Sequence, residues 1–194
     1  HPAKNRLVEV VPGTRTSDAV VRRAWSLQEQ TGKTPIASTD ASGFVVNRYF
    51  VPWLNEAVRL LEEGVADIPT IEAAAIKTFR VGMGPFQLMN VTGVHIAMHA
   101  ANTLGEKFGP FYAPAYTLKD QVALGENWEF EGDADESKFA AIEERMLGAV
   151  YYVAAQLVDE QVGTLEDTDI GARVGLRWPM GPSRRRVQPP PIPA

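Results

Sequence analysis

The sequence has 194 residues, of which 45% are hydrophobic and 22% are charged, the proportions of an ordinary globular protein. The absence of cysteine excludes disulfides, thiol nucleophiles and thiolate metal sites, and it fits a reducing cytoplasm, the compartment we expect. The net charge of -5 argues against a nucleic-acid surface, and without a run of about 18 apolar residues no membrane span is expected.

The chain opens with a predicted strand, helix and second strand. The apolar run 7–11 ends at Pro12-Gly13 and predicts a short buried strand. Apolar residues at helical spacing predict a helix over 17–31, and 34–37 is a second strand candidate. This order is typical of the closing edge of an α/β sheet domain and is too short to be a domain alone.

From Gly43 onward the hydrophobic pattern has a helical period. An acidic connector over 125–135 divides the helical part in two. The arginine run Arg184-Arg185-Arg186 and the prolines after it predict an exposed, irregular tail. The expected helices cover 45–63, 67–78, 86–91, 94–107, 116–124, 136–161 and 166–175.

A single offset of 97 residues aligns two parts of the helical region. The offset runs unbroken through a long helix, a short helix and a Met-Gly-Pro turn, which predicts an internal duplication. Two unrelated amphipathic helices would explain the helix matches but not the turn. The matches pair Arg48 with Arg145, Leu60 with Leu157, Glu63 with Glu160, Arg80 with Arg177, and Met83-Gly84-Pro85 with Met180-Gly181-Pro182.

Five short motifs occur together over about residues 1–125: Leu7-Val8-Glu9-Val10, Gly43-Phe44-Val45-Val46-Asn47-Arg48, Leu54-Asn55-Glu56-Ala57, Glu62-Glu63-Gly64-Val65-Ala66 and Met83-Gly84-Pro85-Phe86. With the motifs in this order and spacing, the sequence resembles the 3-hydroxyacyl-CoA dehydrogenase family. The duplicated helical unit resembles the multifunctional members that act in fatty-acid β-oxidation.

The resemblance implies a mainly α fold: the helical C-terminal domain in two repeats, preceded by a short β-α-β remnant of a Rossmann-type, NAD-binding domain. We expect the end of the NAD-binding domain at 1–40, the first repeat at 41–125 and a shortened second repeat at 136–194. The implied cofactor is NAD and the implied substrate is an acyl-CoA. The implied partners are the missing part of the NAD-binding domain and, in some family members, a fused enoyl-CoA hydratase.

Glu9 is the first candidate catalytic residue. A carboxylate inside an apolar strand is unfavourable without a partner, although an edge-strand Glu facing solvent would avoid that problem. In the family, a Glu in this Leu-Val-Glu-Val setting hydrogen-bonds the histidine that removes the hydroxyl proton. Such a carboxylate fixes the imidazole tautomer and stabilises its charged form.

Asn47 matches the family Asn of the Phe-Val-Val-Asn-Arg motif, which implies a catalytic and substrate-binding role. An amide there can donate to the substrate oxygen without titrating. The alternative is a helix N-terminal residue that satisfies its own backbone. The offset of 97 places Glu144 at the matching position, so we expect the second repeat to be structural and to form an internal pseudo-dimer with the first.

His1 aligns with the family Asn that contacts the cofactor, because His1-Pro2 falls where the family has Asn-Pro. The catalytic histidine is then expected three residues upstream, which suggests a fragment cut just after the base. A role for His1 itself as the base is the alternative.

His95 and His99 could share a helix face as zinc ligands do, but no third ligand stands at a suitable spacing, so no metal is expected. The arginine run at 184–186 could meet a CoA phosphate, although a solvated tail is the simpler interpretation. A Gly-x-Gly-x-x-Gly phosphate loop is absent from this sequence.

The leading hypothesis is therefore the substrate-side portion of an NAD-dependent 3-hydroxyacyl-CoA dehydrogenase, inactive by itself. A non-catalytic helical dimerisation or scaffold module derived from the family is the second. An enzyme of the 6-phosphogluconate dehydrogenase-like helical type is the third.

Overall fold

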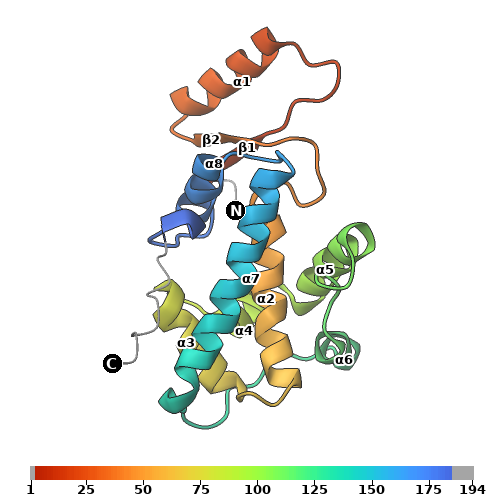
Figure 1. The fold of residues 1–194 in the computed structure, drawn as a ribbon, viewed down its shortest axis with the longest axis vertical. Coiled ribbons are helices and arrows are strands. Elements are labelled where there is room, and N and C mark those ends of the chain that lie inside the picture. Colours follow the sequence, from red (N-terminus) through yellow and green to blue (C-terminus); the bar gives the residue numbers. More distant parts are fainter. Residues whose placement is uncertain (1–2, 185–194) are drawn as a thin grey trace, which may run out of the picture.

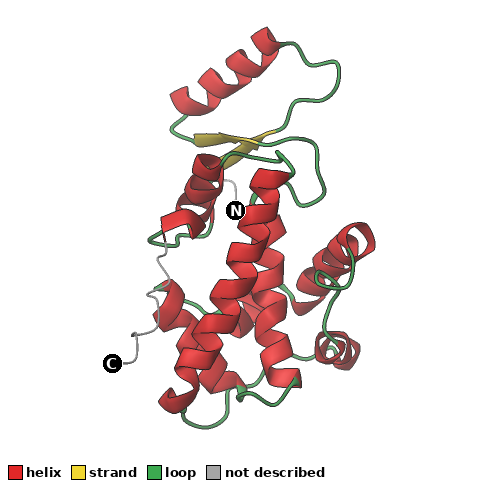
Figure 2. Ribbon diagram, viewed as in Figure 1, coloured by secondary structure: helices red, strands yellow, loops and turns green. Residues whose placement is uncertain are grey.

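A helical body carries a strand–helix–strand segment at one end (Figure 1). The computed structural model describes residues 3–184, and Figure 2 shows that helices dominate it. Within this range, no helix is both long enough and apolar enough to cross a bilayer. The arrangement confirms the predicted mainly α fold class. The elements are β1 (Leu7–Val10), α1 (Asp18–Gln30), β2 (Thr34–Ala37), α2 (Val46–Glu62), α3 (Ile68–Phe79), α4 (Pro85–Thr92), α5 (Val94–Phe108), α6 (Tyr116–Leu124), η1 (Glu136–Lys138), α7 (Phe139–Asp159), α8 (Leu165–Ile170), η2 (Gly171–Gly175) and η3 (Pro182–Arg184).

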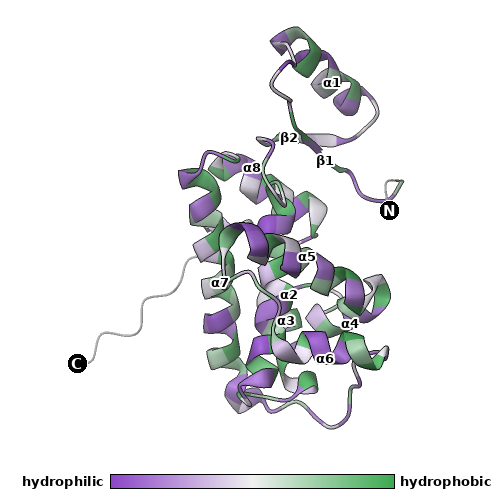
Figure 3. Cartoon of the chain, turned by 90° about the vertical axis from the view of Figure 1, so that its right-hand side faces the viewer, coloured by the Kyte–Doolittle hydropathy of each residue, from purple (hydrophilic) through white to green (hydrophobic). Residues whose placement is uncertain are grey.

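β1 and β2 pair in parallel, in the register that sets Leu7 opposite Thr34. Figure 3 shows α1 beyond the strands, away from the helical body. No residue of α1 is buried, and its Val20 and Leu27 side chains are 55% and 56% exposed. β1 is half-buried along its length, so the prediction of a buried strand is wrong in degree. The reason is that β2 alone pairs with β1 within the described residues.

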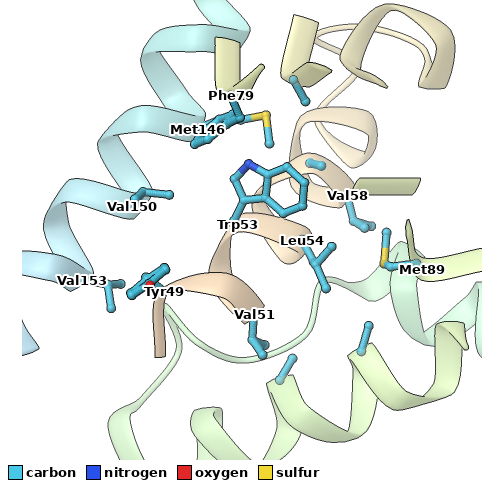
Figure 4. Packing of buried hydrophobic residues seen from close by; sticks show 14 of the residues in the cluster. Tyr49, Val51, Trp53, Leu54, Val58, Phe79, Met89, Met146, Val150 and Val153 are labelled. Atoms are coloured by element: carbon cyan, nitrogen blue, oxygen red, sulfur yellow. The ribbon is translucent and has the colours of Figure 1, made fainter. Parts of the chain in front are cut away.

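α2 is the centre of the helical body. It contacts α3, α4, α5, α6 and α7. Twelve of its 17 residues are buried, including the polar residues Arg48, Asn55 and Glu56. Trp53 of α2 packs against Phe79 of α3, with ring centroids 5.5 Å apart, and lies beside Met146 of α7 in the core (Figure 4). The helix predicted over 45–63 is confirmed to within one residue at each end.

Two ion pairs link α2 and α7 reciprocally. In each pair, an arginine of one helix binds the glutamate that directly follows the other helix. Arg48 Nη2 lies 2.9 Å from Glu160 Oε2, and Arg145 Nη1 lies 2.8 Å from Glu63 Oε2. The two arginines are 97 positions apart, and so are the two glutamates. We refer to residues 41–125 as the first helical unit and to residues 136–184 as the second. Each arginine pairs with the glutamate of the other unit, which is the pattern of contacts in a two-fold interface.

A second set of contacts repeats at the same offset. Glu72 Oε2 accepts a hydrogen bond from Phe86 N at 2.9 Å, and Asp169 Oδ1 accepts one from Ser183 N at 2.9 Å. Both carboxylates therefore bind the backbone just after a Met-Gly-Pro turn. The left-handed residues before these turns, Arg80 and Arg177, have φ angles of 51° and 60°. Each of these contacts lies within one unit, so together they show that the two units share this local structure.

The helix predicted over 166–175 is right only in its first half. α8 ends at Ile170, and Gly171–Gly175 form a wider π turn. A Cβ at Gly171 would lie 2.8 Å from Val46 Cγ2 and 3.0 Å from the Tyr49 hydroxyl. Over one turn, the apolar spacing of an α-helix and a π-helix cannot be distinguished, so this detail was not available from the sequence.

The Glu72 carboxyl makes the folding stability depend on pH. Burial raises its pKa above the ordinary 4.5, and hydrogen bonds from the Phe86, Gln87 and Gly84 backbone oppose that rise. The folded chain then binds the proton more tightly than the unfolded chain. The stabilisation from protonated Glu72 is complete below about pH 4.5 and is lost as the pH rises through the folded-state pKa.

Wild type should therefore lose stability relative to Glu72→Gln as the pH rises from about 4.5 to neutrality. Urea unfolding at a series of pH values measures this, with Glu106→Gln, at an exposed site on α5, as the control. Parallel pH profiles for wild type and Glu72→Gln would contradict the prediction.

Candidate active site

A hollow of about 310 Å³ lies where the strand segment meets the helical body. Three parts of the chain form it: β1 with the residues just before it, the first turn of α2, and the end of the π turn. Its lining residues are Asn5, Leu7, Glu9, Val46, Asn47, Phe50, Gly175 and Leu176. It therefore contains two of the three predicted site residues, Glu9 and Asn47.

Glu9 reaches the hollow because alternate residues of a strand face the same side, and Leu7 and Glu9 share the side that faces α2. Glu9 Oε1 accepts hydrogen bonds from Val45 N at 2.8 Å and Val46 N at 3.1 Å. These amides belong to the start of α2, which has no side-chain cap of its own. A carboxylate from β1 thus supplies the acceptor that a helix N-terminus needs.

Burial raises the pKa of Glu9, and the two backbone hydrogen bonds oppose that rise. Burial also raises the pKa of Tyr49 well above its ordinary value, with smaller contributions from the negative charges of Glu9 and Asp169. The Tyr49 hydroxyl donates to the carbonyl of Thr168 at 3.3 Å. Glu9 Oε2 receives no hydrogen bond from residues 3–184. This oxygen is thus available to accept a hydrogen bond from an imidazole.

Asn47 lies on the first turn of α2 and is exposed. Its side-chain amide has no hydrogen-bond partner among the described residues, so it is not used to satisfy the backbone of its own helix. The amide can both donate and accept. It is therefore free to bind the oxygen of a ligand in the same hollow that contains Glu9.

The other sequence candidates lie elsewhere. His1 is outside the described residues. His95 and His99 are exposed on α5, and the described part of the chain has no group of three side chains suited to a metal ion. Arg185 and Arg186 of the basic tail also fall outside the described range.

Sequence reasoning missed the wall that the second helical unit contributes. Asn5 Nδ2 donates to the carbonyl of Gly175 at 3.3 Å. A Cβ at Gly175 would lie 2.7 Å from Leu7 Cδ2, so this backbone packs directly on β1. The signal that could have suggested this wall is the 97-residue offset, which aligns Leu176 with the buried core residue Phe79.

The lining suits an uncharged polar group better than a pyrophosphate. It offers one carboxylate and two side-chain amides, but no arginine or lysine. The sequence also has no Gly-x-Gly-x-x-Gly loop to bind phosphates. The residues that line the hollow therefore do not form a dinucleotide site by themselves.

Comparisons with known proteins define the class. Residues 43–134 match the 3-hydroxyacyl-CoA dehydrogenase C-terminal domain, and residues 1–41 match the NAD binding domain of the same enzymes. Both matches are thus to domains of 3-hydroxyacyl-CoA dehydrogenases. Since the two matches together cover more than half of the chain, it belongs to the 3-hydroxyacyl-CoA dehydrogenase family. The cofactor that goes with this domain is NAD.

Solved structures agree on the fold. The 3-hydroxybutyryl-CoA dehydrogenase of Escherichia coli superposes with a TM-score of 0.80 at 19% identity, over 92% of this chain and 59% of that one. (S)-3-hydroxybutyryl-CoA dehydrogenase PaaH1 of Ralstonia eutropha gives 0.61 at 32% identity, over 67% and 46%. The dehydrogenase part of multifunctional enzyme 1 from Caenorhabditis elegans gives 0.57 at 20%, over 91% and 46%. The chain spans between 46% and 59% of the length of these three structures.

Proposed function

We propose that the full-length protein oxidises a 3-hydroxyacyl-CoA to the 3-oxoacyl-CoA, and that this chain supplies the substrate side of the site. The observation that carries the proposal is the shared hollow of Glu9 and Asn47. These residues come from a strand and a helix that are 36 or more positions apart. They bring a carboxylate and a free amide together in a chain of the dehydrogenase family.

The roles follow from the chemistry of an alcohol oxidation. A histidine base takes the hydroxyl proton, and Glu9 holds that imidazole through the oxygen that α2 does not use. The Asn47 amide donates to the substrate oxygen and orients it. NAD, when bound, supplies the hydride acceptor.

We also propose that this chain is inactive by itself, and we propose bounds for its domains. Because the residues present do not fit a pyrophosphate, the 194 residues alone should not reduce NAD. We assign 1–40 to the NAD-binding domain, 41–125 to the first helical repeat and 136–194 to the second. We further propose a role in fatty-acid β-oxidation, a fused enoyl-CoA hydratase and a cytoplasmic location, from the resemblance of the motifs and the helical repeat to the multifunctional members of the family.

The second helical unit takes the place of a partner subunit in this proposal. The reciprocal Arg48–Glu160 and Arg145–Glu63 pairs support a duplication that packs as an internal pseudo-dimer. Glu144 stands where the offset places the counterpart of Asn47. The second unit therefore lacks the amide needed for a site of its own.

The test is NADH formation by the full-length protein with racemic 3-hydroxybutyryl-CoA and NAD. Asn47→Ala should lower kcat/KM by about 10- to 100-fold, because one hydrogen bond to the reacting oxygen is lost. Asn127→Ala, at an exposed asparagine in the connector, is the control and should have no effect. A full-length protein that forms no NADH from any 3-hydroxyacyl-CoA would instead support the non-catalytic scaffold module.

A further inference from the structure

The strand pair is held to the helical body mainly through the second helical unit. Ala37 N donates to Asp167 Oδ1 at 3.1 Å, and Thr39 N donates to the carbonyl of Val162 at 2.9 Å. Asn5 donates to the carbonyl of Gly175 from the other end of the segment. β2, the turn after it and the segment just before β1 therefore hydrogen-bond to parts of the chain that lie after α7.

Asp167 is fixed by its own helix before it reaches β2. Its Oδ2 accepts hydrogen bonds from Thr164 N at 3.2 Å and from the Thr164 hydroxyl at 2.5 Å. Thr164 Oγ1 accepts one from Asp167 N in return, which completes a capping box at the start of α8. The capping box uses one carboxylate oxygen and leaves Oδ1 for the Ala37 amide.

The backbone of the second unit also packs against the residues that bind Glu9. A Cβ at Gly163 would lie 2.7 Å from Val45 Cγ2, and one at Gly171 would lie 2.8 Å from Val46 Cγ2. The amides of Val45 and Val46 are those that donate to Glu9. The second unit thus contacts both the exit of β2 and the start of α2.

The corresponding position in the first unit shows what is special about Asp167. The offset of 97 aligns Asp167 with Thr70. Thr70 Oγ1 accepts a hydrogen bond from Asp135 N in the connector at 3.0 Å. Both units thus bind a backbone amide of an incoming segment, but only the second unit does so with a carboxylate and on the strand pair next to Glu9.

We propose that Asp167 is a positioning residue, through which the second helical unit holds the strand bearing Glu9 against the helix bearing Asn47. The second unit then takes part in the reaction by fixing the distance between two groups of the first site. This inference rests on the proposed function for its effect on catalysis. The attachment of the strand pair through Asp167 does not depend on the proposed function.

Hydrogen exchange of the full chain tests the attachment. Asp167→Ala should speed amide exchange over 34–41 about tenfold or more and leave the centre of α2 unchanged. Asp167→Asn keeps an acceptor for Ala37 and should restore most of the protection. Thr164→Ala breaks the capping box that fixes Asp167 and should loosen 165–170 most, with a smaller effect over 34–41 than Asp167→Ala has. Glu166→Gln, at an exposed neighbour, should change nothing.

Kinetics of the full-length protein test the consequence. Asp167→Ala should lower kcat by about tenfold and change KM for 3-hydroxybutyryl-CoA less than twofold, because Glu9 acts on the base and not on substrate binding. Unchanged exchange over 34–41, an equal effect of Thr164→Ala there, or an unchanged kcat would each overturn the inference. If wild type forms no NADH, the proposed function fails, and the exchange experiment still decides whether Asp167 holds the strand pair.

Discussion

Replacing Glu9 with glutamine should lower kcat of the full-length protein by about 10²- to 10⁴-fold. The substitution removes the charge that stabilises the imidazolium formed when the base takes the substrate proton. It retains an oxygen that can accept from Val45 N and Val46 N, so the start of α2 keeps its hydrogen bonds. The loss should therefore appear in catalysis and not in folding.

The measurement is steady-state NADH formation, with urea unfolding of the same variant to show that its stability is retained. Glu72→Gln is the matched control, since Glu72 is also a buried carboxylate that binds two backbone amides but lies outside the hollow. Equal kcat values for Glu9→Gln and wild type would refute the role assigned to Glu9.

Replacing Glu160 with glutamine should destabilise the folded chain by about 2–3 kcal/mol. The Arg48 side chain is fully buried, while that of Glu160 is 40% exposed. Among residues 3–184, Nε and Nη1 of Arg48 have no hydrogen-bond partner, and its guanidinium carbon lies 3.7 Å from the centre of the Phe108 ring. Without the Glu160 charge, the buried guanidinium would retain mainly that cation–π contact.

The two-fold related pair provides an internal control. Arg145 and Glu63 are 42% and 47% exposed, and Arg145 also binds Glu56 Oε1 at 2.6 Å. Glu63→Gln should consequently destabilise by only about 0.5 kcal/mol. Urea denaturation of both variants checks the contrast. Equal destabilisation by the two substitutions would show that burial of the arginine does not decide the strength of these pairs.

The helices and the motif-bearing residues could be predicted from the sequence because their signals are local. Apolar spacing located α2 and α6, and the motifs that contain Glu9 and Asn47 placed both residues in one hollow. The wall of the hollow that Gly175 and Leu176 form could not be predicted in this way. Asn5 and Gly175 are 170 positions apart, and nothing in either local sequence indicates that they meet.

The π turn and the partial exposure of β1 could not be predicted from the sequence, for related reasons. Whether a strand is buried depends on its neighbours, and hydrophobic alternation does not report how many there are. The close approach of Gly171 to Val46 and Tyr49 depends on how α8 packs against α2. Such contacts are set by the assembled fold and not by any window of sequence.

Because the two reciprocal ion pairs lie in one polypeptide, a substitution in one pair leaves the sequence of the other unchanged. In a symmetric homodimer, one substitution alters both halves of the interface at once, so a harmful effect is doubled. With both halves in one polypeptide, each half can vary independently of the other. Arg48 is enclosed beside Phe108, whereas its counterpart Arg145 is 42% exposed and binds a second carboxylate. The duplication that we propose would thus permit a specialisation that strict symmetry forbids.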